Sequence, residues 1–372
     1  MSKNPDSRGT AHPIDVAAGA VPGGSSGSIR VCKHAEVVRI ATDPNHFSSA
    51  VSRFVQIPNG LDGVEHARFR ALVDRYFTPE AMLVFAPACR AVARDLVAGL
   101  PRDRAFDAMR DLGAPFAVRA QSAWLGWPIE LERTLLDWLE TRQAAVRSGD
   151  PARNVEVAER FDSIIRSLIE PRRSSDGTRD VTDRLIHDES AGRPLEDAEI
   201  VSILRNWTGG DLGSIALAVG VIVHDLAADP DLAARLRGVT EDESFDRYLE
   251  EVLRRDDPFV ASRRVTARGA VVAGERVAAG RRIALDWAAA NRDAAVFPSP
   301  DRFDPDGNAA RNLVYGIGPH ACPGRPLARL ELRELTRALL ADAPELALAG
   351  SIVREELPLG GYRSVPVRLA PQ

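Results

Sequence analysis

The chain contains little cysteine and no long apolar run. Its three cysteines, Cys32, Cys89 and Cys322, lie far apart and are odd in number, so they match neither a disulfide framework nor a zinc-ligand spacing. Free cysteines are typical of proteins that fold in the reducing cytoplasm. No basic start precedes a long apolar segment, and the run Ile215–Val223 is too short to span a bilayer. We therefore expect a cytoplasmic protein that does not enter a membrane.

An excess of charge of one sign is also lacking. The formal net charge is −5 and the pI is near 5.9, so the composition indicates no nucleic-acid-binding surface. A length of 372 residues, 45% of them hydrophobic, fits either two or three ordinary domains or one large helical domain built around a cofactor. Residues 1–28 are rich in Gly, Ser, Pro and Ala, which predicts a flexible tail. We expect residues 29–372 to form a single domain.

Apolar residues recur near a period of 3.6 along most of the chain, which is typical of amphipathic helices. Most of these segments are bounded by Pro, Gly, Ser or Asp. They are His66–Tyr76, Pro79–Val97, Ile129–Val146, Val155–Ile169, Asp197–Leu226, Pro230–Leu236, Phe245–Arg255 and Pro326–Leu340. Strand signals are few: Val260–Ile283 predicts hairpins, and Ile352–Val353 with Val365–Leu369 predicts another. The pattern predicts a mainly α fold with a small β portion.

The segment Tyr315–Gly324 reads YGIGPHACPG and combines conformational freedom with rigidity. Its glycines let the main chain approach a flat ligand closely, and its prolines stiffen the loop. The helix that begins near Pro326 should point its N-terminus toward Cys322, and such a position lowers the pKa of a thiol. A rigid loop that presents a thiolate suits a metal ligand. The alternative is a buried structural cysteine in a Gly-rich turn.

This loop resembles the haem-binding loop of the cytochrome P450 family, which reads aromatic, Gly, any, Gly, any, His, any, Cys, any, Gly. Every position matches, with Tyr315 where Phe is usual. The resemblance implies the P450 fold, a triangular helical domain that encloses a haem b, with the Cys322 thiolate as the axial ligand of the iron. It also implies that Tyr315, Gly316, His320 and Gly324 contact the haem.

Further residues match the family's structural cluster. Glu251 and Arg254 lie three apart on one helix face, and Arg302 follows in FPSPDRFDP. The resemblance implies a buried Glu–Arg–Arg cluster that joins this helix to the loop before the cysteine. An exposed ion pair of little energetic value is the alternative.

The family also holds the haem propionates with positively charged side chains, because arginine binds carboxylates bidentately. Four residues of this chain match those contacts: His66, Arg70, Arg264 and His320. His66 and Arg70 stand four apart and so share one helix face. Arg263 competes with Arg264, which we prefer for its spacing from the preceding proline.

The helix Asp197–Leu226 departs from the family where it should cross the haem. Relatives usually show a small residue, Gly, any residue, an acid and Thr, whereas Thr208–Leu212 reads TGGDL. Asp211 keeps the acid, but Leu212 lacks the hydroxyl that helps deliver protons in typical members. Either Thr208 replaces that hydroxyl, or the substrate supplies a hydroxyl or a water, or the enzyme couples rings without inserting oxygen. We therefore predict catalytic roles for Asp211, Thr208 and position 212.

The substrate pocket is expected to include Leu204, Trp207, Phe259 and Val260. The first two lie one or two turns before Leu212, and the last two match pocket-lining positions in relatives. An aromatic residue on a helix is as often part of the core. The stretch between Phe47 and His66 is shorter than in relatives, which hints at a more open pocket or a bulky substrate.

We expect a monooxygenase that oxidises a small organic, secondary-metabolite or peptide substrate with O2. Electrons would come from a ferredoxin or flavodoxin with its reductase. A basic surface of Arg75, Arg311, Arg325 and Arg329 would receive that donor, unless these are ordinary solvated arginines. The alternatives are an oxidative coupling enzyme, a haem-binding sensor without turnover, and a peroxide-driven enzyme, which the retained Asp211 disfavours.

Overall fold

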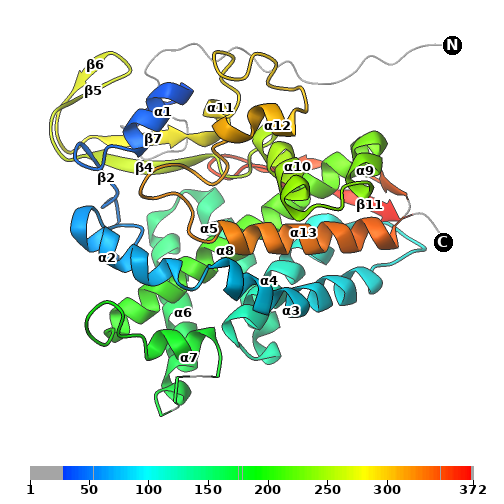
Figure 1. Cartoon of the computed structure of the whole chain (residues 1–372), viewed down its shortest axis with the longest axis horizontal. Helices are drawn as coiled ribbons and strands as arrows, with labels where there is room; N and C mark the ends of the chain where they lie inside the picture. The colour runs from blue at the N-terminus through cyan, green and yellow to red at the C-terminus, as the bar shows by residue number, and fades with distance from the viewer. Residues whose placement is uncertain (1–27, 53, 175, 178, 344, 370–372) are drawn as a thin grey trace.

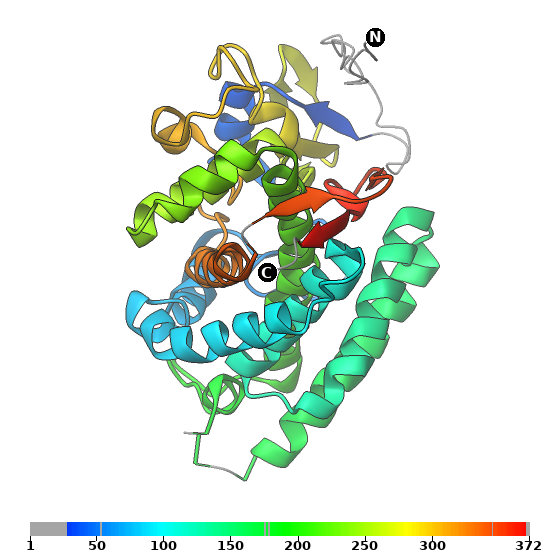
Figure 2. The same ribbon diagram turned by 90° about the vertical axis from the view of Figure 1, so that its right-hand side faces the viewer.

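One long helix, α8 (Asp197–Ala228), crosses the centre of the molecule (Figure 2). The computed structural model describes residues 28–52, 54–174, 176–177, 179–343 and 345–369. α8 begins at a capping box: the Glu196 side chain accepts a backbone N–H from the first turn, and the Glu199 side chain accepts the backbone N–H of Glu196. The tail predicted over residues 1–28 lies outside the described residues except for Ser28.

The other helices surround α8 or extend from it (Figure 1). The longer ones are α2 (Gly63–Asp74), α3 (Pro79–Ala98), α4 (Ala114–Leu125), α5 (Glu132–Ser148), α6 (Pro151–Ile169), α10 (Asp242–Arg255) and α13 (Arg325–Asp342). The shorter ones are α1 (His34–Ala41), α7 (Val181–Ile186), α9 (Pro230–Arg237), α11 (Trp287–Ala290) and α12 (Pro305–Asn308). A π-helical segment, Ala108–Gly113, leads into α4, and 3-10 turns lie at Ile129–Leu131, Glu170–Arg172 and Ala309–Arg311.

The strands form small sheets. The largest has the order β1-β7-β4-β2, with β1 (Ile29–Val31) parallel to β7 (Arg282–Asp286) and β4 (Ala261–Thr266) antiparallel to both β7 and β2 (Phe47–Ser48). β5 (Ala270–Val272) and β6 (Glu275–Val277) form a hairpin. A second sheet has the order β3-β11-β8, and β9 pairs with β10; their bounds are β3 Phe106–Asp107, β8 Leu346–Leu348, β9 Val353–Arg354, β10 Tyr362–Ser364 and β11 Pro366–Leu369.

The predicted fold class, mainly α with a small β portion, is confirmed. Every predicted helix is present, with ends shifted by a few residues. The hairpins predicted within Val260–Ile283 are also present. The predicted hairpin near the C-terminus is wrong, because β9 pairs with β10 whereas β11 pairs with β3 and β8. The sequence pattern missed α4, which is buried on most sides and so has no polar face to mark its period.

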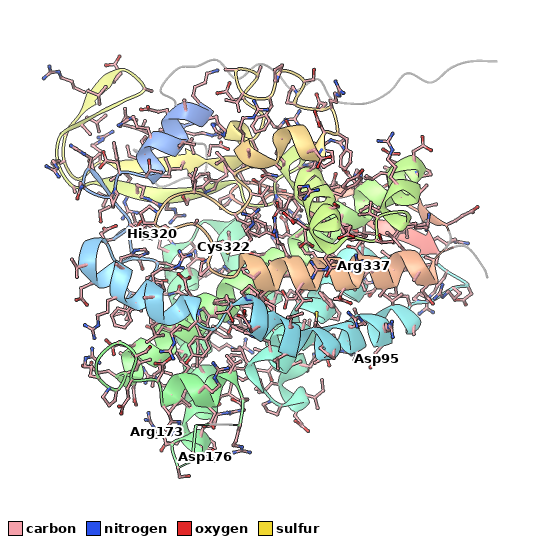
Figure 3. All side chains as sticks on the ribbon, viewed as in Figure 1. Asp95, Arg173, Asp176, His320, Cys322 and Arg337 are labelled. Carbon is pink, nitrogen blue, oxygen red and sulfur yellow. The ribbon has the colours of Figure 1, made fainter. Side chains whose placement is uncertain are left out.

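Two groups of buried apolar side chains stabilise the fold. The helical core joins α3, α4, α8, α10 and α13, and α3 and α13 run side by side (Figure 1). The sheet core lies between α1 and the largest sheet and includes Val37, Phe47, Leu285, Trp287 and Leu313. The chain segment that carries Cys322 passes between these two cores (Figure 3).

α8 is apolar enough, and long enough, to cross a membrane by length and composition alone. However, 72% of its most apolar window is buried inside the protein. The helix therefore has the burial of a core helix, and its apolar residues are accounted for by packing.

Candidate active site

Hydrogen bonds within the loop before α13 fix the backbone of Cys322. The N–H of Cys322 donates to Tyr315 O at 2.8 Å, and the N–H of Ala321 donates to Gly318 O at 3.0 Å. Gly316 and Gly318 adopt φ values of 67° and 79°, which favour glycine. A Cβ atom at Gly318 would also lie 2.9 Å from Ala41 O. The loop glycines are therefore needed for this turn and for its contact with α1.

A cavity of about 470 Å³ opens beside this loop. Cys322 lines it from one side, and its side chain is exposed to the cavity. Burial raises the pKa of the Cys322 thiol above its usual value, against the lowering effect of the Gly324 and Arg325 backbone N–H groups. The predicted lowering by the helix N-terminus exists but is outweighed by desolvation in the described structure.

Positively charged and imidazole groups gather at one edge of the cavity. His320 and Arg264 line it, and the rings of His66 and His320 lie 4.1 Å apart between centroids. Burial lowers the pKa of His320 to about 4, helped by the charges of His66 and Arg264. His320 Nε2 lies 3.5 Å from Asp62 Oδ1 and forms no hydrogen bond within the described chain. This edge therefore offers unused donors to an anionic ligand.

The predicted donors differ in how they reach the cavity. Arg264 is 6% exposed and lines the cavity, whereas Arg263 also lines it but is exposed, which favours Arg264. Burial lowers the pKa of Arg264. Arg70 instead donates to the backbone oxygens of Pro319 and Ala321, so it braces the loop that carries Cys322.

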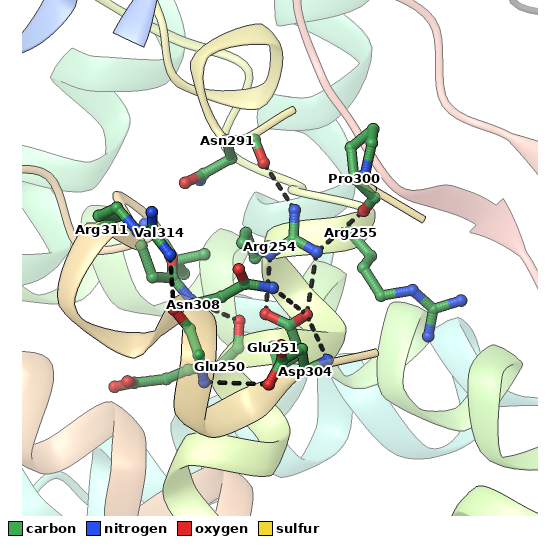
Figure 4. Close-up of polar contacts among 12 residues, drawn as sticks. Glu250, Glu251, Arg254, Arg255, Asn291, Pro300, Asp304, Asn308, Arg311 and Val314 are labelled. Atoms are coloured by element: carbon green, nitrogen blue, oxygen red, sulfur yellow. Dashed lines mark hydrogen bonds and ion pairs between the residues drawn. The ribbon is translucent and has the colours of Figure 1, made fainter. Parts of the chain in front are cut away.

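A buried ion pair joins α10 to the chain that leads into the cysteine loop (Figure 4). Arg254 is fully buried, and its guanidinium donates to both carboxylate oxygens of Glu251 at 2.7 and 2.9 Å. Arg254 also donates to the backbone oxygens of Asn291 and Pro300. The amide of Asn308 donates to Glu251 at 2.8 Å.

The predicted third member of this cluster is wrong. Arg302 is exposed, and within the described chain its side chain makes no bond to Glu251. The backbone N–H of Asp304 and the side chain of Asn308 satisfy the carboxylate instead. A neutral amide avoids placing a second buried cation beside Arg254.

The face of α8 that borders the cavity differs from the predicted one. It consists of Asn206, Trp207, Gly210, Asp211, Ser214, Ile215 and Ala218. Leu204, Thr208 and Leu212 are fully buried and do not belong to the described lining. Thr208 donates its hydroxyl to Leu204 O within the helix. The predictions that Leu204, Thr208 and Leu212 face the cavity are therefore wrong, whereas Trp207 and Asp211 do face it.

Ser214 is the hydroxyl residue that the motif comparison missed. It lies one turn beyond Gly210, lines the cavity, and donates its hydroxyl to Gly210 O. Position 214 falls on the same helix face as Trp207 and Asp211, at spacings of seven and three residues. The helical period of 3.6 residues could have identified Ser214 from the sequence. A comparison restricted to the five consecutive residues TGGDL does not extend to position 214.

Aromatic side chains form another wall of the cavity. Trp207 packs against Phe77 and Trp124, with ring centroids 5.5 and 5.3 Å away, and all three line the cavity. Trp207 Nε1 is buried without a hydrogen-bond partner in the described chain. Phe259 lines the cavity as predicted, but Val260 does not belong to the described lining.

The described residues of the short segment 49–61, which leave out position 53, lie across α8 and contribute Ser49, Val51, Pro58 and Asn59 to the cavity. Ser202 accepts the N–H of Ile57 and donates to Val55 O. Asn206 donates to Ile57 O at 2.9 Å. Arg205 donates to Val55 O and pairs with Asp162. The short segment is thus fastened to α8 rather than left open.

The arginines predicted to form a basic surface have partners. Arg325 and Arg329 both pair with Glu250, at 3.0 and 2.7 Å. Arg75 lies 3.8 Å from Asp188, and Arg311 donates to Gly307 O. Three of these arginines therefore share two carboxylates, Glu250 and Asp188, so an electron donor would meet a surface whose positive charge is only partly compensated.

Comparisons with known proteins agree with this arrangement. The family model described as Cytochrome P450 matches residues 244–342. The chain is 30% identical to cyclomarin C epoxidase CymV of Salinispora arenicola, over 81% of this chain and 79% of that protein. It is 30% identical to cytochrome P450 monooxygenase PikC of Streptomyces venezuelae, over 82% of this chain and 74% of that protein.

The chain belongs to the cytochrome P450 family. A mutant of P450 EryK in complex with erythromycin B superposes with a TM-score of 0.83 and 28% identity, covering 93% of this chain and 91% of that chain. This P450 is therefore a monooxygenase-type oxidoreductase with haem iron as its cofactor. Neither a coupling reaction nor a sensor role receives support from these relatives.

The residues around the cavity fit a haem. A flat, apolar ring needs the aromatic wall and the close approach that Gly316 permits, and its carboxylates need the donors of His320 and Arg264. The orphaned Nε2 of His320 is a polar atom that such a ligand would satisfy.

Proposed function

We propose that this P450 binds haem b through the thiolate of Cys322 and oxygenates an apolar secondary metabolite on the α8 side of the cavity. The observation that carries the proposal is the position of Cys322 on the cavity wall, in the same enclosure as the α8 face with Asp211 and Ser214. The thiol must lose its proton to bind iron, and the Gly324 and Arg325 N–H groups then stabilise the negative sulfur.

When bound, the haem supplies the activation of O2 with electrons delivered from outside. The protein's residues hold and orient it: His320 and Arg264 would bind the propionates, His66 would support His320 by ring contact, and Arg70 would brace the loop. Tyr315, Gly316 and Gly324 line the side on which the sulfur lies. The Ser214 hydroxyl, held by Gly210 O, would pass a proton into the cavity.

The lining supports a largely apolar substrate. Trp207, Phe259 and Ile215 offer apolar surface, while Asn206 and Asn59 add a few polar groups. The related proteins act on or bind natural products, as the names of the cyclomarin C epoxidase and the erythromycin B complex state. A ferredoxin or flavodoxin with its reductase would supply electrons to the protein in the cytoplasm.

The test is the absorbance of the reduced protein under carbon monoxide. The wild-type protein should show the red-shifted band of thiolate-ligated haem, and Cys322→Ser should lose it. Cys32→Ser is the matched control, because Cys32 lies outside the cavity lining and should keep the band. A band that survives in Cys322→Ser, or that is absent from folded wild-type haem protein, would contradict the assignment.

A further inference from the structure

Arg263, in the middle of β4, is an arginine of the cavity wall that no acidic residue of the described chain neutralises. Its side chain is exposed, lines the cavity, and forms neither an ion pair nor a hydrogen bond with the described residues. Burial alternates along β4, so Arg264 and Thr266 are buried whereas Ala261 and Arg263 are exposed. Because Arg263 is both exposed and part of the wall, it lies where the cavity opens to solvent.

Two buried hydroxyl groups border the same part of the cavity. Ser262 precedes Arg263 on β4 and Ser49 follows β2; both line the cavity, and neither Oγ atom has a hydrogen-bond partner among the described residues. β2 pairs antiparallel with β4, with Ser48 opposite Val265, so the residues after Ser48 and those before Val265 lie at the same end of the sheet (Figure 1). Buried hydroxyl groups without partners indicate that a polar ligand group belongs in this corner.

The wall of the cavity carries more positive than negative charge. Its arginines are Arg263 and Arg264, and Asp211 is the one acid among the described lining residues. Burial raises the pKa of Asp211 to about 7, so at neutral pH this carboxyl offsets only part of the positive charge. Burial lowers the pKa of His320 to about 4, which leaves that imidazole neutral. An anion that enters the cavity therefore meets a net positive wall.

The proposed haem contacts use the buried arginine and leave the exposed one available. Arg264 is 6% exposed and lies with His320 at the edge that would hold the propionates. Arg263 follows Phe259 and Ala261, which also line the cavity and give it an apolar wall. A guanidinium at the end of an apolar wall matches a carboxylate at the end of an apolar molecule, because arginine binds carboxylates through two parallel hydrogen bonds.

We propose that Arg263 binds a carboxylate of the substrate, so that this P450 acts on apolar secondary metabolites that end in a carboxylic acid. The Ser262 hydroxyl donates to the same carboxylate. Holding the substrate by its acid end fixes which carbon reaches the haem, so Arg263 determines specificity and does not act on the reacting atoms. The inference rests on the proposed monooxygenase function.

The test uses ω-(imidazol-1-yl)alkanoic acids of increasing chain length and their methyl esters. The imidazole binds the haem iron and shifts its absorbance, while the chain carries the carboxylate or the neutral ester toward β4. At the matching length, the haem-loaded wild type should bind the acid about ten-fold more tightly than the ester, because the charged ligand forms stronger hydrogen bonds. Arg263→Gln should remove this preference, and Ser262→Ala should reduce it several-fold.

Arg268→Gln is the matched control and should keep the full preference for the acid. Arg268 is also exposed and follows the same strand, but it donates to Asn45 O and does not belong to the described lining. The carbon monoxide band of each protein reports haem-thiolate ligation separately, so its absence from the folded wild type would overturn the proposed function itself.

Three results would overturn the carboxylate site and leave the haem assignment intact. The first is equal binding of acid and ester by the wild type at every chain length, with the carbon monoxide band present. The second is an unchanged preference for the acid in Arg263→Gln. The third is a loss of haem from Arg263→Gln that Arg264→Gln does not show, which would assign Arg263 to a haem propionate.

Discussion

At the scale of single residues, the helix face on which a side chain lies determines whether it can act in the cavity, and its place in a sequence motif does not. Leu212 stands where relatives carry threonine, yet its side chain points into the helical core, and Ser214 presents the hydroxyl to the cavity. The absence of a hydroxyl at position 212 therefore gives no reason to expect an unusual reaction.

We predict that Ser214→Ala lowers oxygenation by about 100-fold or more and increases peroxide release, because a proton relay is lost. Leu212→Thr should leave peroxide release unchanged but lower the free energy of unfolding by about 2 kcal/mol, because a fully buried apolar side chain is replaced. Oxygen consumption, peroxide yield and denaturant unfolding measure these effects. Peroxide release that responds to position 212 and not to 214 would contradict the geometry.

The cysteine loop and the Glu251–Arg254 pair were predictable from sequence because each is a local pattern with a strict spacing. Arg302 and Ser214 were not, for a shared physical reason. Both roles depend on the direction in which a side chain points and on which other side chain lies within hydrogen-bonding distance. Asn308 bonds to Glu251 in the position that the sequence predicted for Arg302. The order of residues in a short motif gives neither the direction of a side chain nor its distance from a partner.

The buried ion pair gives a stability prediction with an internal control. Arg254→Ala should lower the free energy of unfolding by about 3–5 kcal/mol, because it leaves the Glu251 carboxylate buried without its cation. Arg302→Ala should change it by less than about 0.5 kcal/mol, since that side chain is exposed. Urea denaturation followed by circular dichroism compares the two variants. Equal losses in the free energy of unfolding would show that Arg302 belongs to the buried cluster after all.

At the scale of elements, α8 does two jobs, and Asn206 takes part in both. One face lines the cavity, while Ser202, Arg205 and Asn206 near its start fasten the segment 49–61. The sequence predicted α8 well because the helix is long and begins at a clear cap. From the shortness of the segment, the sequence indicated a more open pocket or a bulky substrate. It could not indicate the hydrogen bonds to α8, because segment length does not reveal bonds to a distant helix.

We predict that Ser202→Ala loosens this segment without unfolding the protein. The hydroxyl makes two bonds to the backbone of Val55 and Ile57, and their loss leaves a buried N–H unsatisfied at a cost of about 1–3 kcal/mol. Hydrogen exchange should accelerate at segment 49–61, and binding and release of azole ligands should speed up. Ser167→Ala, on the exposed side of α6, is the control that should change neither.

At the scale of the whole molecule, both cores contribute side chains to the wall of the cavity. Trp287 and Ile317 belong to the sheet core, Phe77, Trp124 and Trp207 belong to the helical core, and all of them line the cavity. A rigid haem in this position would contact both groups at once, so its binding energy would be shared between the two halves of the fold.

Removal of haem should therefore separate the unfolding of the two cores. The haem-loaded protein is expected to unfold in a single transition, stabilised by about 4 kcal/mol when free haem exceeds its dissociation constant 1,000-fold. The haem-free protein should melt in two steps, with the smaller sheet core first, because it buries fewer apolar side chains. Differential scanning calorimetry resolves the steps, and hydrogen exchange assigns the earlier one to β1, β4 and β7.

Readdition of haem should restore a single transition in the wild type. In Cys322→Ser, which retains the cavity but loses the bond to iron, the restored transition should lie at a lower temperature. A single, unshifted transition in the haem-free protein would mean that the cores are coupled through the polypeptide itself.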